Sequence, residues 1–163
     1  EQIIKNSAID ACAQCTEAFD SKISNPYTKF MCNHAFDLLE EGILTKNYEK
    51  IVLGSLIDGL GFGNSSTTLG HALSYVFSNE GVSHGHALAF TTTVAHEFNN
   101  SQYYERFNTL VKKLNFSKIK LEQFLDEAAE TILPDKKHLD NNPKSVSKTD
   151  ILNLLEKIIS KNS

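Results

Sequence analysis

Hydrophobic residues recur along most of the chain with the three-to-four-residue period of amphipathic helices. This pattern predicts helices over residues 3–19, 27–43, 47–60, 71–77, 84–98, 101–114, 120–133 and 148–159. Asn25 followed by Pro26 is a typical helix start. No stretch shows the two-residue alternation of a half-buried strand. The sequence therefore predicts an all-α fold, a multi-helix bundle.

Two segments interrupt the helical pattern. Residues 61–70 are rich in Gly, Ser and Thr, and residues 135–147 form a polar loop that contains the third proline. Neither segment separates regions of different composition, and no internal repeat is present. A chain of 163 residues is long enough to bury one core. We therefore expect a single helical domain over residues 1–163.

Composition narrows the class of protein. The formal net charge of −4 argues against a general nucleic-acid binder and against a basic membrane-surface protein. No apolar run approaches the roughly 20 residues of a membrane span. Three cysteines do not make a disulfide framework, so a reducing compartment, the cytoplasm, is expected. We interpret the C-x-x-C pair Cys12 and Cys15 as buried, reduced thiols rather than a redox site.

Polar residues in the first predicted helix are the first candidates for chemistry. Asp10, Gln14 and Glu17 recur at i, i+4 and i+7 and so share one face. The surrounding sequence AIDACAQC is small and apolar, and a carboxylate in such a setting needs a cation, a metal or several donors. A polar stripe that faces solvent is the other reading, and this segment alone does not decide between them.

Histidines at two adjacent helix breaks are the second set of candidates. His71 follows Gly70 at a predicted helix start, and His84 begins the next long helix within S-H-G-H. One Asp and two His form the minimal ligand set for a divalent transition metal, and neutral imidazole suits Fe, Zn, Ni and Cu. Hydrogen-bonded core histidines are the alternative interpretation.

Three motifs together resemble the iron-containing, group III, alcohol dehydrogenases. HALSY followed by SHGHALAF resembles the segment in which that family places two metal-ligand histidines. Upstream, D-A-C-A-Q-C-T-E resembles D-A-x-x-H-x-x-E, and near the C-terminus NNPKSVSKTDILNLLEKI resembles the family's closing segment. The resemblance covers about Asp10 to Ile159. It is strongest to a branch that includes phosphonoacetaldehyde reductases.

This resemblance implies a fold, a ligand set and a reaction. The fold is the C-terminal, dehydroquinate-synthase-like helical domain of a longer two-domain enzyme, and the N-terminal NAD(P)-binding domain is absent from this sequence. Asp10, His71 and His84 match metal ligands, and Gln14 stands where the family usually has a third His. The implied metal is Fe²⁺, with Zn²⁺ as the other choice, and NAD(P)H would be bound by the missing domain. The implied substrate is a small aldehyde or alcohol, and a homo-oligomer is compatible with the resemblance.

Other residues receive roles that the sequence leaves open. His86 is a candidate catalytic residue, as a proton relay or substrate contact, or else a structural histidine. Glu17 and Tyr75 could hold the ligands in place. His34, His96 and His138 are interpreted as structural or exposed. Glycines at 59–64 have the wrong spacing for a nucleotide-binding loop and are interpreted as close-packing positions beside the metal site.

Departures from the family pattern bear on the substrate. Ser83 replaces the usual Pro, and residues 65–68, SSTT, lack the cation typical of the phosphonate-handling branch. A semialdehyde that bears a carboxylate is therefore as well supported as a phosphonate. A standalone helical scaffold or metal-binding domain without catalysis is the main alternative. A lyase of the dehydroquinate-synthase type and a non-haem iron oxygenase are disfavoured, because the lyase motif and β structure are not seen.

Overall fold

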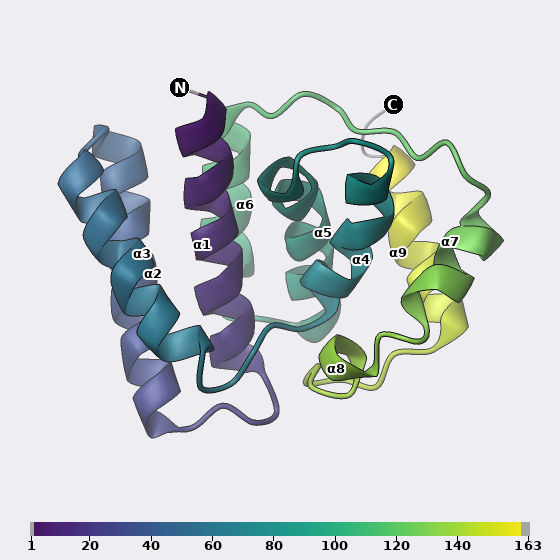
Figure 1. The fold of residues 1–163 in the computed structure, drawn as a ribbon, viewed down its shortest axis with the longest axis horizontal. Helices are drawn as coiled ribbons and strands as arrows, with labels where there is room; N and C mark the ends of the chain where they lie inside the picture. The colour runs from purple at the N-terminus through teal and green to yellow at the C-terminus, as the bar shows by residue number, and fades with distance from the viewer. Residues whose placement is uncertain (1, 161–163) are drawn as a thin grey trace.

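The computed structural model describes residues 2–160, and this part of the chain is helical and without strands, as predicted (Figure 1). The helices are α1 (Gln2–Asp20), α2 (Pro26–Thr45), α3 (Tyr48–Phe62), α4 (Leu69–Asn79), α5 (His84–Asn99), α6 (Tyr104–Leu114), α7 (Leu125–Ile132), α8 (Lys136–Leu139) and α9 (Lys148–Ser160). None of them combines the length and apolar character that a bilayer-spanning helix requires.

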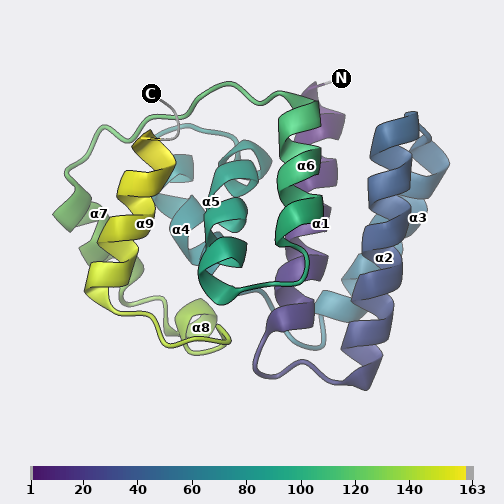
Figure 2. The ribbon, with the colours of Figure 1, turned by 180° about the vertical axis from the view of Figure 1, so that it is seen from behind.

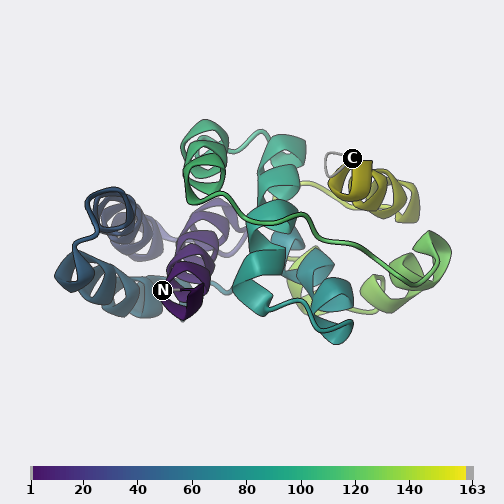
Figure 3. The ribbon, with the colours of Figure 1, turned by 90° about the horizontal axis from the view of Figure 1, so that it is seen from above.

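Helix α1 lies in the middle of the molecule. The antiparallel pair α2 and α3 packs on one side of it, and α5, which pairs with α4, packs on the other (Figure 1). Figure 2 shows α6 alongside α1 on the opposite face from the viewpoint of Figure 1. Seen from above, α7 and α9 form the end of the row farthest from α2 and α3 (Figure 3). Helix α1 thereby lies between two helix pairs.

Local sequence explains where α2 and α3 begin. The side chain of Asn25 accepts a hydrogen bond from the Thr28 amide at 2.9 Å, and Pro26 occupies the first turn. Asn47 caps α3 in the same way, accepting from the amide of Lys50 at 3.2 Å. The expected helix start at residues 25–27 is therefore confirmed.

Two hydrophobic clusters make the core. The first joins α1 to α2, α5 and α6, and its largest fully buried side chains include Phe36, Phe107 and Tyr103. The second joins α4 and α5 to α7 and α9 through residues such as Leu73 and Ile151. Helix α5 contributes to both clusters. It therefore connects the two clusters.

The prediction of a helix over residues 120–133 was wrong in its first part. Residues 115–124 form an irregular connection across one edge of the molecule, and α7 begins only at Leu125 (Figure 1). The carboxylate of Glu80 accepts hydrogen bonds from the amides of Glu122 and Gln123, at 2.8 and 3.1 Å. Because these amides already have a partner on another element, the helical period of the segment does not decide its structure.

The interpretation of the cysteines is confirmed, whereas that of the glycines at 59–64 holds at Gly61 and not at Gly59, where a Cβ would meet no atom within 4 Å. Cys12, Cys15 and Cys32 are buried, unpaired thiols. A side chain at Gly61 would place its Cβ 2.6 Å from the sulfur of Cys32, so this glycine allows α3 to lie directly against α2. Residues 61–68 thus leave α3 through a close helix contact and lead the chain to α4 beside the ligands.

Candidate metal centre

Three of the predicted ligand side chains meet at one point. Oδ1 of Asp10 on α1 lies 3.8 Å from Nε2 of His71 on α4 and 3.9 Å from Nε2 of His84 on α5. One donor atom from each of the three residues falls within 4.8 Å of the other two. Residues more than 60 positions apart in sequence are therefore brought together by the packing of α1, α4 and α5.

His71 is fixed by Glu17 so that one ring nitrogen stays free. Nδ1 of His71 lies 2.9 Å from the Glu17 carboxylate, which also accepts from the amide of Thr68 at 2.8 Å. The ring donates through Nδ1–H, so Nε2 is the nitrogen that can offer a lone pair to a metal once its proton has left. That Nε2 and Oδ1 of Asp10 are buried and lack a hydrogen-bond partner within the described part of the chain.

Charge around His71 is unbalanced without a cation. Burial alone would lower the pKa of His71, but the carboxylates of Glu17 and Asp10 outweigh it and raise this pKa to about 9. Burial alone would raise the pKa of Glu17, yet the His71 imidazole and the Thr68 amide hold it below its ordinary value. The site therefore binds a proton in place of a cation, and a metal at Nε2 must displace that proton.

His84 is oriented by Ser74. The hydroxyl of Ser74 donates to the His71 carbonyl at 2.8 Å, and its oxygen lies 3.4 Å from Nδ1 of His84. Since the hydroxyl proton is already used, Nδ1–H of His84 is the donor in the second contact, and Nε2 is left with its lone pair on the side of Asp10. Burial lowers the pKa of His84, although Asp10 acts in the opposite direction. His84 is thus neutral and ready to ligate at neutral pH.

A glycine lets α4 approach α1 closely enough for this arrangement. A side chain at Gly70 would place its Cβ 2.0 Å from Oε1 of Glu17 and 2.8 Å from Cα of Thr92. The backbone of α4 begins here, directly against the carboxylate that holds His71. Glycine at position 70 therefore has a steric cause: any larger residue would push His71 away from Glu17.

Gln14 stands on the same helix as Asp10, one turn later, and is half-buried. No hydrogen bond joins the side-chain amide of Gln14 to another residue between 2 and 160. The amide oxygen is therefore not committed to another partner. Its role as a ligand stays a prediction.

His86 lies outside the group formed by Asp10, His71 and His84. Its Nε2 lies 2.6 Å from the carbonyl oxygen of Ser117, and its ring contacts that of Phe116 at 5.2 Å between centroids. Both contacts belong to the connection over residues 115–124. This placement favours the structural alternative for His86, and its catalytic role stays a prediction.

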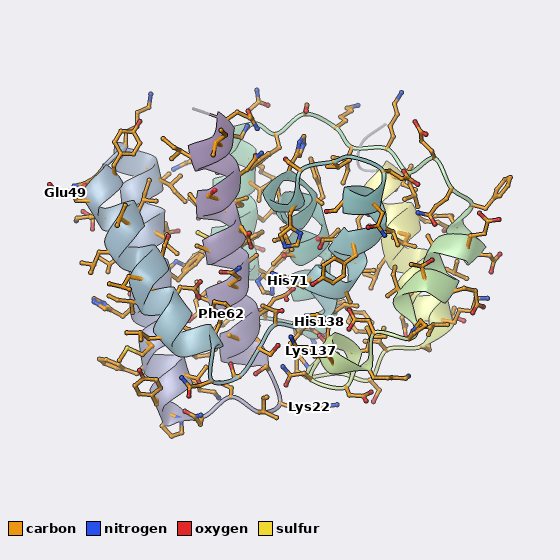
Figure 4. All side chains as sticks on the ribbon, viewed as in Figure 1. Lys22, Glu49, Phe62, His71, Lys137 and His138 are labelled. Atoms are coloured by element: carbon orange, nitrogen blue, oxygen red, sulfur yellow. The ribbon has the colours of Figure 1, made fainter. Side chains whose placement is uncertain are left out.

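Two aromatic side chains that were given minor roles complete the surroundings of the ligands. Tyr75 stacks on His84, with ring centroids 5.9 Å apart and planes 13° from parallel. His138 stacks on His71 at 6.2 Å and also contacts Tyr75 at 5.8 Å. Figure 4 shows His71 and His138 as neighbours, although α4 and α8 are far apart in sequence. His138 had no signal in the sequence beyond an Asp three residues before it.

Asp58 is a buried carboxylic acid that the sequence interpretation passed over. It lies in α3 with 1% of its surface exposed, and its Oδ1 has no hydrogen-bond partner in residues 2–160. Burial, reinforced by the nearby Asp10 carboxylate, raises the pKa of Asp58 to about 8. The available signal was an Asp within the otherwise apolar run GSLIDGLGF. Asp58 is therefore neutral at pH 7 and adds no charge to the ligand group.

The chemistry of the donor set fits a divalent transition metal. Two imidazole nitrogens with fixed tautomers and one carboxylate oxygen face one another, and two of these three atoms are buried without a partner. Such atoms are costly to bury unless a ligand satisfies them. Imidazole and carboxylate together suit iron or zinc, whereas magnesium and calcium prefer all-oxygen sites.

Comparison with known families and proteins supports one interpretation of this geometry. Residues 4–131 match the sequence profile of the Fe-containing alcohol dehydrogenase family, C-terminal. The 4-hydroxybutyrate dehydrogenase of Clostridium kluyveri is 33% identical over 122 residues, which cover 67% of this chain and 32% of that protein. The chain thus spans about one third of the length of this relative.

Solved structures share the fold. An iron-containing alcohol dehydrogenase from Thermococcus thioreducens superposes with a TM-score of 0.85 at 21% identity, over 98% of this chain and 51% of that one. A sulfoacetaldehyde reductase from Bifidobacterium kashiwanohense, solved with NAD⁺, gives a TM-score of 0.80 at 21% identity, over 98% and 50%. The described helices therefore correspond to about half of each of these proteins.

Proposed function

The chain belongs to the Fe-containing alcohol dehydrogenase family through its C-terminal domain, and we propose that it is the metal-binding domain of an NAD(P)-linked alcohol dehydrogenase. The single observation that carries this proposal is the convergence of Asp10, His71 and His84 with their ligand atoms within 4.8 Å. The family match reaches from residue 4 to residue 131 and so includes all three residues.

Asp10, His71 and His84 would hold the metal, and the amide oxygen of Gln14 would be the fourth protein donor. An amide oxygen binds more weakly than the imidazole usual at that position, so we expect a lower metal affinity than a third histidine would give. A bound divalent ion would act as a Lewis acid on the substrate oxygen. We favour Fe²⁺, with Zn²⁺ as the alternative that the same donors would accept.

The residues of this chain have separate tasks in the proposed reaction. Glu17 holds Nδ1–H of His71, and Ser74 holds Nδ1–H of His84, so that both Nε2 atoms keep the orientation that ligation requires. Asp10 contributes the one negative charge among the three donors. Tyr75 covers the ring of His84 on one side and limits the access of water to it.

Hydride transfer needs a nicotinamide, and the described residues have no strand-turn-helix unit that could bind one. We propose that a nucleotide-binding half supplies it, because the chain covers only about half of the similar solved structures. A small aldehyde or alcohol with an anionic end is the proposed substrate class. Two similar proteins are named for such compounds, 4-hydroxybutyrate and sulfoacetaldehyde.

Activity of the complete gene product tests this proposal. The metal-free protein should be inactive, and Fe²⁺ or Zn²⁺ should restore NAD(P)⁺-dependent oxidation of 4-hydroxybutyrate. Acetaldehyde reduction serves as the comparison with an uncharged substrate. The isosteric variant Asp10→Asn should lose metal-dependent activity, whereas His34→Asn, at an exposed histidine, should not. Full activity in the presence of a chelator, or in Asp10→Asn, would contradict the proposal.

A further inference from the structure

His138 and Asp135 form a second, tightly held pair beside the candidate metal centre. Nδ1 of His138 lies 2.8 and 2.7 Å from the two carboxylate oxygens of Asp135. Asp135 also caps the short helix α8 by accepting from the His138 amide at 3.4 Å. The ring of His138 is therefore fixed in position by a carboxylate three residues before it.

The His138 ring belongs to the immediate surroundings of the ligands. Its centroid is 6.2 Å from that of His71 and 5.8 Å from that of Tyr75. His71 is in turn 5.4 Å from His84, and His84 is 5.9 Å from Tyr75, so the four rings form a closed circuit. Two members of the circuit are candidate ligands. The other two have side-chain polar atoms that the metal does not need.

One ring nitrogen of His138, Nε2, has no hydrogen-bond partner among residues 2–160. Since Nδ1–H donates to Asp135, Nε2 of His138 is a hydrogen-bond acceptor. It accepts no hydrogen bond from any residue between 2 and 160, and, unlike Nε2 of His71, it is not sealed away from solvent. Yet the side chain as a whole is only 8% exposed. A fixed, nearly buried ring with one free acceptor beside a metal site is suited to contact a bound molecule.

Neither the family match nor the sequence motifs assign a role to this residue. His138 lies beyond residues 4–131, which are the residues that match the family profile. The structural role suggested by its sequence position explains the bond to Asp135. It gives no partner to the other nitrogen, Nε2, of a ring that contacts the rings of His71 and Tyr75.

We propose that His138 is a substrate-contacting residue, whose Nε2 accepts a hydrogen bond from the hydroxyl of the alcohol bound at the Asp10–His71–His84 centre. Asp135 is the positioning residue that fixes the ring in the required tautomer. This inference rests on the proposed function, because it needs an alcohol at the metal site. It adds the C-terminal loop, through α8, to the elements that form the substrate site.

A matched pair of substitutions separates the substrate contact from the contact with Asp135. In His138→Asn the amide nitrogen falls near the position of Nδ1, so the bond to Asp135 is kept and the acceptor at Nε2 is lost. In His138→Gln the amide reaches the position of Nε2, so the acceptor is kept and the bond to Asp135 is lost. His34→Asn is the control for substitution of an exposed histidine.

Binding and kinetics are both measured on the metal-loaded complete gene product. Calorimetry compares 4-hydroxybutyrate with butyrate, which differs only in lacking the hydroxyl, and steady-state assays give kcat/KM for 4-hydroxybutyrate oxidation. We expect His138→Asn to lower kcat/KM roughly tenfold, the effect of losing about one hydrogen bond. It should weaken binding of 4-hydroxybutyrate but not of butyrate, and His138→Gln should retain most of both parameters. Metal content should equal that of the parent in all variants.

The opposite ranking, in which His138→Gln is impaired and His138→Asn resembles the parent, would overturn the inference in favour of a structural role. Equal weakening of both ligands would place His138 at the carboxylate end and also overturn it. If the parent oxidises 4-hydroxybutyrate and both His138 variants match it in binding and kcat/KM, only the role of His138 is refuted. A parent that neither binds nor oxidises it would refute this inference together with the proposed function.

Discussion

Helix α1 places carboxylates next to two buried histidines, His71 and His96. The pKa values of these two histidines are shifted in opposite directions. Carboxylates raise the pKa of His71 to about 9, whereas burial lowers that of His96 to about 4. The hydroxyl of Thr16 donates its proton to the backbone carbonyl of Cys12. Its oxygen lies 2.8 Å from Nε2 of His96, so Nε2–H donates to it. His96 therefore stays neutral within the core, with Nε2 hydrogen-bonded.

The difference lies in what surrounds the remaining ring nitrogen. Nδ1 of His96 lies 3.8 Å from a carboxylate oxygen of Asp20, and burial raises the pKa of that carboxyl to about 6. Nε2 of His71 faces Asp10, and a second imidazole nitrogen, from His84, approaches the same carboxylate. A buried histidine beside a carboxylate is thus insufficient for a metal site. Convergence of a further donor distinguishes the candidate site from a core histidine.

The pH dependence of stability gives the largest expected contrast between the two histidines. Because the folded-state pKa of His71 is raised, its stabilising contribution in the metal-free protein is complete below pH 6.5 and is lost as the pH rises through 9. The contribution of neutral His96 is complete above pH 6.5 and is lost as the pH falls through 4. Each of these two pH-dependent changes in the free energy of unfolding amounts to about 3 kcal/mol at most.

Urea unfolding at several pH values measures these changes. It is carried out on the metal-free parent, His71→Gln and His96→Gln. The difference in free energy of unfolding between the parent and His71→Gln should shrink only on the alkaline side. The difference for His96→Gln should shrink only on the acid side. If the two variants showed the same pH profile, the distinction between the histidines would be lost.

Removing the charge of Glu17 should have the next largest effect. Glu17→Gln keeps the size of the side chain but weakens its hold on Nδ1–H of His71, and substitution of such a partner typically lowers metal affinity about 10- to 100-fold. A competition titration of Zn²⁺ against a chromophoric chelator measures this affinity. Affinity equal to that of the parent would show that Glu17 does not orient a ligand.

Neutralising Asp20, the carboxylate beside His96, should have the smallest effect, and it should stabilise the fold instead of weakening metal binding. The raised pKa of Asp20 means that its charged form is penalised in the fold, and this penalty grows as the pH rises from 3.8 to about 6 and is complete above it. Asp20→Asn should therefore increase the free energy of unfolding at pH 7–8 by about 1–2 kcal/mol. Its Zn²⁺ affinity should stay that of the parent, and a decrease would indicate that the two histidine sites are coupled.

Much of the fold could be predicted from hydrophobic periodicity. The periods of the longer helices, together with Asn25 and Pro26, were sufficient to place most of them within a few residues. The irregular structure of residues 120–124 could not be predicted, because the carboxylate of Glu80 binds the amides of Glu122 and Gln123 from another element. That interaction depends on tertiary structure and leaves no local periodic signal.

The candidate site was only partly visible in the sequence. Asp10, His71 and His84 were found because an acid in an apolar helix and histidines at helix breaks are unusual, and because the motifs resembled a family. The roles of Ser74 and Asp135 depend on which ring nitrogens they hold, and only the packing of α4, α5 and α8 determines that. Sequence spacing likewise did not distinguish His86, which contacts Ser117, from a residue of the site.

Metal stoichiometry tests the central claim most directly. Protein purified without chelators and then dialysed against Zn²⁺ is analysed for bound metal, for the parent, Asp10→Ala, His84→Ala and the control His34→Ala. Circular dichroism verifies that each variant remains helical. We predict about one ion per chain in the parent and in His34→Ala, and a loss of most of it in Asp10→Ala and His84→Ala. Parent-like metal content in folded Asp10→Ala and His84→Ala would contradict the account.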